Sequence, residues 1–332
     1  LEDVTGTFQV DLRKDALGEE ACQTITDLVD LGDWIGVEGP LFRTRTGEIT
    51  VRASEWQFLA KSLRPLPYGK SEEDPETGER IVHSGFSDIE ARYRQRYADL
   101  AVHPEVRDVF RARSRMVTAV REFMDGENFL EVETPALQPL YGGATARPFV
   151  TKHNALDRTM YLRIADELYL KRLIVGGFDR VYEIAKDFRN EGLSRFHNPE
   201  FTMLEFYQAF ADYHDMMDQV ERLIVHVADR VLGSRTGFYQ GQEISFETPF
   251  KRIRLVDSLA DALGADPMEM EEAELKDRAR KLKIPELDGA GRGKLLDKLF
   301  EALVQEELRQ PTFVLDHPKE LSPLAKGHRK YE

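Results

Sequence analysis

Charged and aromatic residues between positions 180 and 210 are spaced so that they can meet on one face of a two-stranded hairpin. Successive side chains of a strand point to opposite faces. One face of the first arm therefore carries Glu183, Ala185, Asp187, Arg189 and Glu191, and one face of the second arm carries Phe201, Met203, Glu205 and Tyr207. Pairing the arms predicts a surface that combines Arg189, Glu191, Phe201, Glu205 and Tyr207.

These residue types suit a charged, planar ligand. An arginine guanidinium can hold a phosphate or a carboxylate through paired hydrogen bonds, and a phenylalanine ring can stack on a purine. The loop that joins the arms, residues 192–200, contains Arg195, His197 and Asn198, which can cover a polyphosphate. The alternative is a solvent-facing side of a sheet whose charges form cross-strand ion pairs. Residue spacing alone is compatible with both.

The elements that would position this surface are predicted from the periodicity of apolar residues. Helical spacing covers residues 106–126, and a helix over 167–175 ends at two glycines. Glu167 begins that helix, where the helix dipole favours a carboxylate whatever its function. Strands are predicted at 129–133, 160–164, 181–189, 201–210 and 311–315, and further helices at 216–232, 255–263, 272–282 and 293–308. The fold class of this region is α+β.

Residues 1–62 are predicted to form a small barrel of short strands with one inserted helix. Strands are expected around 8–12 and 34–38, a hairpin over 41–45 and 48–55 that turns at Thr46-Gly47, and a helix over 17–28. Residues 63–90 follow as a connector, whose charged segment 71–79 with Pro75 and Gly78 is expected to be a surface loop.

Composition excludes some classes of protein. The 332 residues suffice for about two domains. A formal charge of −14 disfavours a protein that coats nucleic acid non-specifically, but it permits a local basic surface. Cys22 is the only cysteine, so an internal disulfide is impossible and a reducing compartment, the cytoplasm, is expected. We expect no membrane span, because no run of about 18 apolar residues exists. We expect no signal peptide, because the first residues show no charged n-region followed by an apolar h-region.

The spacing of the hairpin residues resembles a family pattern. Phe188-Arg189-Asn190-Glu191, followed by His197, Phe201 and Glu205 at intervals of four, resembles motif 2 of the class II aminoacyl-tRNA synthetases. The long helix and the segment 129–135 resemble motif 1. Segments 90–97, 142–149, 163–173 and 197–202 resemble the lysyl-tRNA synthetases in particular. The likeness covers nearly the whole chain, with two departures: Asp166 stands where a proline is expected, and the connector is longer than usual.

The resemblance implies a binding site for ATP. Arg189 would bind the α-phosphate and the carboxylate of the amino acid. Glu191 would hold the adenine amino group, with Phe201 stacked on the ring, and His197 and Asn198 would contact phosphate and adenosine. Arg189 would supply one cation and Mg²⁺ the rest.

The resemblance also implies a lysine pocket formed by the backbone around Gly143 and by Glu167, Glu205 and Tyr207. Two acids and a tyrosine in one cleft suit a ligand that carries ammonium groups. Taken alone, Glu205 is equally compatible with a structural role as an ion-pair partner. The reaction implied has two steps: lysine is activated with ATP to lysyl-adenylate and pyrophosphate, and is then transferred to tRNA(Lys).

The implied architecture is an OB-fold anticodon-binding domain over 1–62, a connector over 63–90 and a catalytic domain over 91–332, built on an antiparallel sheet flanked by helices. Gln9 and Glu48 match positions that contact the anticodon, although both are also ordinary residues for a loop. Pro135 matches a position at the interface of a homodimer.

Three alternatives remain open at this point. Aspartyl- and asparaginyl-tRNA synthetases share the architecture, but an aspartate pocket needs cations where Glu167 and Glu205 stand. A ligase that attaches lysine to a protein would share the pocket, although such relatives usually lack the OB domain. A tRNA-binding module without activity is the third alternative, which the intact motif 2 disfavours.

A third motif of the family, which carries an ATP-binding arginine and nearby acids for Mg²⁺, is not recognisable after Phe201. We therefore expect the start of the OB domain and the motif 3 region to be missing, with most Mg²⁺ ligands in the missing part. Taken literally, the 332-residue chain is expected to be unable to activate lysine.

Overall fold

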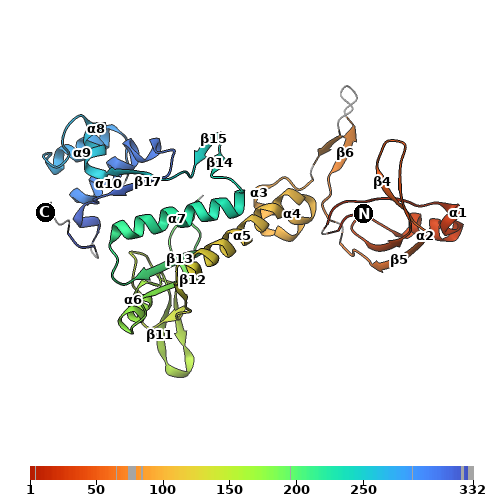
Figure 1. The fold of residues 1–332 in the computed structure, drawn as a ribbon, viewed down its shortest axis with the longest axis horizontal. Helices are drawn as coiled ribbons and strands as arrows, with labels where there is room; N and C mark the ends of the chain where they lie inside the picture. Colours follow the sequence, from red (N-terminus) through yellow and green to blue (C-terminus); the bar gives the residue numbers. More distant parts are fainter. Residues whose placement is uncertain are drawn as a thin grey trace. The chain divides into compact units, whose positions relative to one another are not determined.

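The computed structural model describes residues 1–3, 5–64, 66–73, 80–83, 85–194, 196–285, 287–322 and 325–327. The chain divides into two compact units, Leu1–Arg111 and Ala112–Glu332 (Figure 1).

The first unit begins with two small sheets. β1 (Gln9–Asp11), β4 (Ile49–Arg52) and β3 (Leu41–Arg43) form one sheet, in which β1 is parallel and β3 antiparallel to β4. β2 (Trp34–Glu38) pairs with β5 (Glu55–Ala60) in the other. The hairpin predicted around Thr46-Gly47 is confirmed, but its second arm ends early and the chain continues as β5. Within the described residues the two sheets do not close into a barrel.

A close backbone approach holds β2 and β4 near each other. A Cβ atom on Gly39 would lie 1.9 Å from the carbonyl oxygen of Arg52, so only glycine fits there. The helix predicted over 17–28 is confirmed with a later start, as α2 (Glu19–Leu28). Leu17 instead ends a separate short helix, α1 (Lys14–Leu17), because Gly18 with φ +87° interrupts the helical backbone between them.

The connector contains regular structure, so the prediction of a surface loop was wrong for its described part. β6 (Lys70–Glu73) pairs antiparallel with β7 (Arg80–His83), and α3 (Ile89–Arg94) and α4 (Arg96–Val102) follow. A two-stranded ribbon is held by backbone hydrogen bonds and needs no apolar face, so periodicity did not reveal it. Pro75 and Gly78 lie outside the described residues.

The second unit is built on a three-stranded sheet with the order β13-β12-β8. β12 (Arg180–Phe188) and β13 (Glu200–Gln208) form the predicted antiparallel hairpin, and β8 (Leu130–Glu131) runs parallel to β12. α5 (Pro104–Gly126) and α7 (Tyr213–Leu232) cover it (Figure 1). A shared core of Phe123, Met124, Phe129, Tyr182 and Leu223 joins these helices to the hairpin.

A second sheet and a helix border the hairpin. β9 (Leu137–Gln138), β11 (Arg158–Leu162) and β10 (Val150–His153) form this sheet, with a 3-10 turn, η1, at Asn154–Leu156. α6 (Glu167–Val175) then begins and ends where the sequence predicted, and it packs on both arms of the hairpin. The chain thus returns to the hairpin face at residues 163–167.

The remainder of the second unit is a helical cluster. It comprises β14 (Thr236–Tyr239), β15 (Gln242–Ser245), β16 (Lys251–Arg254), α8 (Leu255–Leu263), α9 (Glu272–Lys281), α10 (Arg292–Leu303), η2 (Gln305–Glu307), β17 (Thr312–Leu315) and η3 (Lys319–Leu321). Buried leucines from the three helices, including Leu259, Leu275 and Leu295, form its core. β17 pairs in parallel with β16, so the predicted strand at 311–315 has a neighbour within the chain. None of the helices in the described part of the chain is long and apolar enough to cross a bilayer.

Candidate active site

The hairpin brings four of the predicted site residues onto one face. The register pairs Asp187 with Phe201 and Glu183 with Glu205, which places Glu205 and Tyr207 on the same face as Phe201. The Tyr207 hydroxyl donates a hydrogen bond to Glu205 Oε1 at 2.7 Å. The Arg189 guanidinium lies over the Phe201 ring, 5.1 Å from its centroid.

The N-terminus of α6 supplies a second carboxylate to this face. Glu167 packs against Gly143, where an added Cβ would lie 2.9 Å from Glu167 Cβ and where φ is +90°. Glu167 accepts a hydrogen bond from Lys171 Nζ at 2.6 Å, and the same ammonium lies 5.7 Å from the centroid of the Tyr207 ring. The structure therefore connects the four residues of the predicted pocket: Gly143 packs against Glu167, the Lys171 ammonium joins Glu167 to Tyr207, and Tyr207 bonds to Glu205.

Asp166 links the two parts of the site through its backbone. Its N–H donates to Glu205 Oε2 at 3.0 Å, which fixes the carboxylate against the start of α6. Asp166 occupies the N-cap position of that helix, yet its side chain makes no capping hydrogen bond. A capping aspartate normally accepts from the first turn, so this carboxyl is used in another way.

A buried cluster of acids surrounds one guanidinium on the same face of the hairpin, where Glu183 is paired with Glu205 and Asp187 with Phe201. Arg163 contacts Glu183 Oε1 at 2.7 Å, Asp166 Oδ1 at 3.1 Å and Asp187 Oδ1 at 3.4 Å. All four residues are buried. Glu183 also accepts from the backbone N–H and hydroxyl of Thr134.

The two aspartates differ from Glu183 in their hydrogen bonding. None of the four carboxylate oxygens of Asp166 and Asp187 has a hydrogen-bond partner among the described residues. Burial raises the pKa of Asp166 to about 7, with the charge of Asp187 adding to the effect. Burial likewise raises the pKa of Asp187 to about 6, against the favourable charge of Arg163. Burial and the bond to Glu205 also raise the pKa of Tyr207 well above its usual range.

Sequence reasoning did not identify this cluster as part of the site. The signal was present, because Glu183 and Asp187 share their strand face with Arg189. Arg163 and Asp166 lie in the loop before α6, and no periodicity shows that a loop residue packs against this face of the sheet.

The loop between the hairpin arms carries the remaining predicted ATP-site residues. Glu191, His197 and Asn198 are exposed, and His197 Nδ1 lies 2.6 Å from the hydroxyl of Ser194. The backbone N–H of Asn190 donates to the carbonyl of Arg147 at 2.8 Å, which ties the loop to the segment after Gly143. Arg195 lies outside the described residues.

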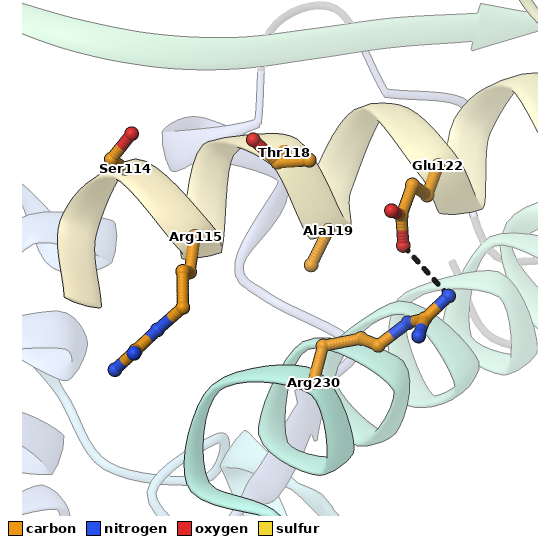
Figure 2. Close-up of a pocket in the computed structure, with 6 residues that line it drawn as sticks. All are labelled: Ser114, Arg115, Thr118, Ala119, Glu122 and Arg230. Carbon is orange, nitrogen blue, oxygen red and sulfur yellow. Dashed lines mark ion pairs between the residues drawn. The ribbon is translucent and has the colours of Figure 1, made fainter. Parts of the chain in front are cut away.

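Two cavities are lined by residues other than those of the hairpin. One, of about 260 Å³, lies between α5 and α7 in the second unit and is lined by Ser114, Arg115, Thr118, Ala119, Glu122 and Arg230 (Figure 2). Figure 2 shows the ion pair that joins Glu122 to Arg230 across the two helices, at 3.0 Å. This cavity includes none of the predicted site residues.

The other cavity, of about 380 Å³, lies in the first unit and is lined by Gln9, Val10, Asp11, Arg13, Phe42, Arg43, Thr44, Arg45 and Thr50. Gln9 is exposed there and accepts a hydrogen bond from the Thr50 hydroxyl at 2.7 Å. Glu48 is exposed on the neighbouring turn but is not part of this lining.

Pro135, the residue predicted for a dimer interface, lies in the second unit. It is exposed, and its carbonyl accepts a hydrogen bond from Gln138 Nε2 at 3.0 Å.

A magnesium site is not assembled by the described residues alone. No three side chains of histidine, cysteine, aspartate or glutamate in the described ranges converge as metal ligands would. The buried acids pair with Arg163 instead.

Comparison with known proteins identifies the family. Residues 88–332 match the model of the class II tRNA synthetases (D, K and N). The chain is 50% identical over 332 residues to the lysine–tRNA ligase of Aquifex aeolicus, covering 99% of the chain and 53% of that protein. It is 50% identical over 331 residues to the lysine–tRNA ligase of Carboxydothermus hydrogenoformans, covering 99% of the chain and 65% of that protein.

A third relative, the lysine–tRNA ligase of a Synechococcus strain, is 51% identical over 333 residues, covering 99% of the chain and 63% of that protein. The chain thus spans between about half and two thirds of the length of these relatives. With the family model matched across the whole hairpin site, this chain belongs to the class II tRNA synthetases of the aspartate, lysine and asparagine group.

Proposed function

We propose that the protein containing this chain is a lysine–tRNA ligase, which activates lysine with ATP and transfers it to tRNA(Lys). The observation that carries the proposal is the pair of carboxylates, Glu167 and Glu205, beside Tyr207 on the hairpin face. In this arrangement Lys171 already contacts Glu167 through an ammonium group. The names of the three relatives support the same substrate.

The proposed chemistry needs no side-chain nucleophile. An oxygen of the lysine carboxylate attacks the α-phosphorus of ATP, and the bond to the pyrophosphate oxygen breaks. The terminal ribose hydroxyl of the tRNA then attacks the carbonyl carbon of the adenylate, and AMP leaves. The chain contributes by positioning the reactants and by neutralising charge. Arg189 is the cation we assign to the α-phosphate and the lysine carboxylate.

ATP is the nucleotide that we propose for the same face. Phe201 would stack on the adenine, on the ring that the Arg189 guanidinium now covers. Glu191 would accept a hydrogen bond from the adenine amino group. His197 and Asn198, both exposed on the adjoining loop, would contact phosphate and adenosine.

An aspartate substrate fits this face poorly. The side chain of aspartate would meet Glu167, Glu205 and, on the same face, the cluster of buried acids. Like charges in a site of low dielectric repel one another strongly. The charge of the pocket therefore favours lysine over the other two amino acids of the family.

We propose further that residues 1–62 belong to an OB-fold anticodon-binding domain and that residues 91–332 belong to the catalytic domain. The cavity lined by Gln9, Phe42 and three arginines supports an RNA contact in the first unit, because bases stack on aromatic rings and arginine binds phosphate. We assign Glu48 to the same contact and Pro135 to a homodimer interface. Such an enzyme would work in the cytoplasm.

Pyrophosphate exchange tests the proposal. The full-length protein is assayed for exchange of labelled pyrophosphate into ATP in the presence of each of the amino acids in turn. We expect exchange with lysine and none above background with aspartate or asparagine. Exchange driven by aspartate or asparagine would assign the chain to another member of the family, and a chain that binds tRNA without any exchange would be a binding module.

A further inference from the structure

The buried aspartates Asp166 and Asp187 are not used by the proposed chemistry. They lie beside Glu205: Asp187 shares its face of the hairpin, and Asp166 donates its backbone N–H to the Glu205 carboxylate. Both are fully buried, and both approach the single guanidinium of Arg163. Their four carboxylate oxygens lack hydrogen-bond donors among the described residues.

Two ionised carboxylates in this position would be costly. A buried polar oxygen without a donor carries an uncompensated loss of hydration, and two like charges on one guanidinium repel each other. A proton on one of the acids removes one charge and supplies a donor that the oxygens lack. The raised pKa values of both acids follow from the same burial and repulsion.

The charged groups around the pair are fixed by four elements. The loop before α6 supplies Arg163, α6 supplies Glu167 and Lys171, β12 and the residue after it supply Glu183 and Arg189, and β13 supplies Glu205 and Tyr207. Together with the two aspartates, the acids in this set outnumber the three cations, so a positive charge in addition to Lys171 would favour loss of the proton.

We propose that Asp166 and Asp187 form a proton-binding pair that holds one proton while the amino acid pocket is empty and releases it when a cationic side chain binds against Glu167 and Glu205. The step is an exchange of charges: the ligand's ammonium enters, the O–H bond of the acid breaks, and the proton passes to solvent. The two aspartates are positioning residues, since neither touches the ligand. The inference rests on the proposed function, because lysine is the cation considered.

The binding experiment uses the full-length protein and lysine. Titration calorimetry in two buffers with different heats of ionisation, at pH 6.5, measures protons released per lysine bound. We expect a release that approaches one proton, and a dissociation constant that falls by up to about tenfold per pH unit on the acid side of the titration. Asp166→Asn resembles the neutral acid in shape, so it should bind lysine with almost no proton release and little dependence on pH.

Asp187→Asn is the second variant, which keeps the test available if Asp166→Asn fails to fold. It should likewise bind lysine with almost no proton release. Asp157→Asn is the matched control, because Asp157 is exposed at the turn after β10 and its ion pair with Lys152 lies away from the site. The control should release as many protons as the unaltered protein.

Thermal unfolding without ligand separates this inference from the proposed function. An acid whose pKa is raised on folding binds its proton more tightly in the native state, so stability is lost as pH rises from about 4 towards 7. The melting temperature of the unaltered protein should fall over this range more than that of Asp166→Asn, which should be the more stable of the two at pH 8.

The outcomes are distinct. Lysine binding without proton release, and with the same pH dependence in the unaltered protein and both asparagine variants, would overturn the proton pair and leave the proposed function standing. Failure of lysine to bind at any pH would overturn the proposed function and the linkage with it, whereas the melting profiles would still report whether the empty site holds a proton.

Discussion

At the scale of single residues, Glu205 makes the most specific prediction. Its two oxygens accept from Tyr207 and from the backbone of Asp166, so its position is fixed before any ligand binds. Glu205→Gln should raise the KM for lysine by roughly tenfold to a hundredfold, since a hydrogen bond to a charged group contributes about 1.5–3 kcal/mol. The KM for ATP should change little. Pyrophosphate exchange measures both.

Glu200→Gln is the matched control, because Glu200 is exposed and pairs only loosely with Lys186, at 3.5 Å. It should leave both constants unchanged. Equal weakening of lysine and ATP in the Glu205 variant would show that Glu205 supports the hairpin rather than the amino acid.

Phe201 gives a prediction about the nucleotide. Its ring contacts the Arg189 guanidinium. The ring is only half-buried, so part of its surface is open to a base. Phe201→Ala should weaken ATP binding by about 1–3 kcal/mol, the usual value of a stacked base, while the melting temperature changes little. Phe206→Ala is the contrast, because Phe206 packs edge-on against Phe129 in the core and its loss should cost about 3–5 kcal/mol of stability. If both variants lose stability alike, Phe201 is a core residue.

Lys171 occupies the pocket with an ammonium group of the chain itself. A bound lysine that contacts Glu167 must displace it or share the carboxylate. Because the Lys171 side chain is half exposed, the ion pair is worth only about 0.2–1 kcal/mol. Lys171→Met should therefore lower the KM for lysine by a few-fold, with kcat unchanged, in the pyrophosphate exchange assay. Lys186→Met, on an exposed part of β12, should have no effect. A raised KM in the Lys171 variant would mean that this residue orients Glu167 for the ligand.

At the scale of elements, the site depends on how closely the glycine segment before β10 approaches α6. Gly143→Ala would place a methyl group 2.9 Å from Glu167 Cβ in a backbone conformation of φ +90°. We expect a loss of about 1–2 kcal/mol from the backbone conformation, and a rise in the KM for lysine as Glu167 is pushed aside. Melting curves and pyrophosphate exchange measure the two effects.

Gly177→Ala separates the two causes. Gly177 has φ +105° but no atom within 4 Å of an added Cβ, so its substitution should lower stability without changing the KM for lysine. An unchanged KM in the Gly143 variant would show that the contact with Glu167 is unimportant for the amino acid.

The elements differ in how far the sequence predicts them. α6 and the β12–β13 hairpin follow from apolar periodicity, because each buries one face and the burial decides the structure. The alternation of side chains along each strand also predicted that Phe201, Glu205 and Tyr207 share one face of the hairpin. The ribbon β6–β7 was missed, since backbone pairing leaves no pattern in a charged segment. The contact of Asp166 with Glu205 was also beyond prediction, because it depends on where a loop returns in space.

At the scale of the whole molecule, the two compact units differ in the evidence that supports their assignment. The catalytic assignment of the second unit rests on a family model that begins at residue 88. The strands of the first unit were mostly predicted, but their arrangement as two sheets was not, because strand pairing between distant segments is not encoded in local alternation. Long-range pairing is therefore the level at which sequence reasoning failed here.

The arginine-lined cavity of the first unit has a kinetic consequence. Arg13, Arg43 and Arg45 line it on a chain whose formal charge is −14. A polyanion that approaches such a molecule is repelled by the net charge and attracted by this patch, so productive collisions are selected by orientation before any contact forms. Added salt screens both effects, which reach only about 8 Å at physiological ionic strength. The cavity would thus affect the association rate of an RNA and the orientation in which the RNA arrives, and not its dissociation rate.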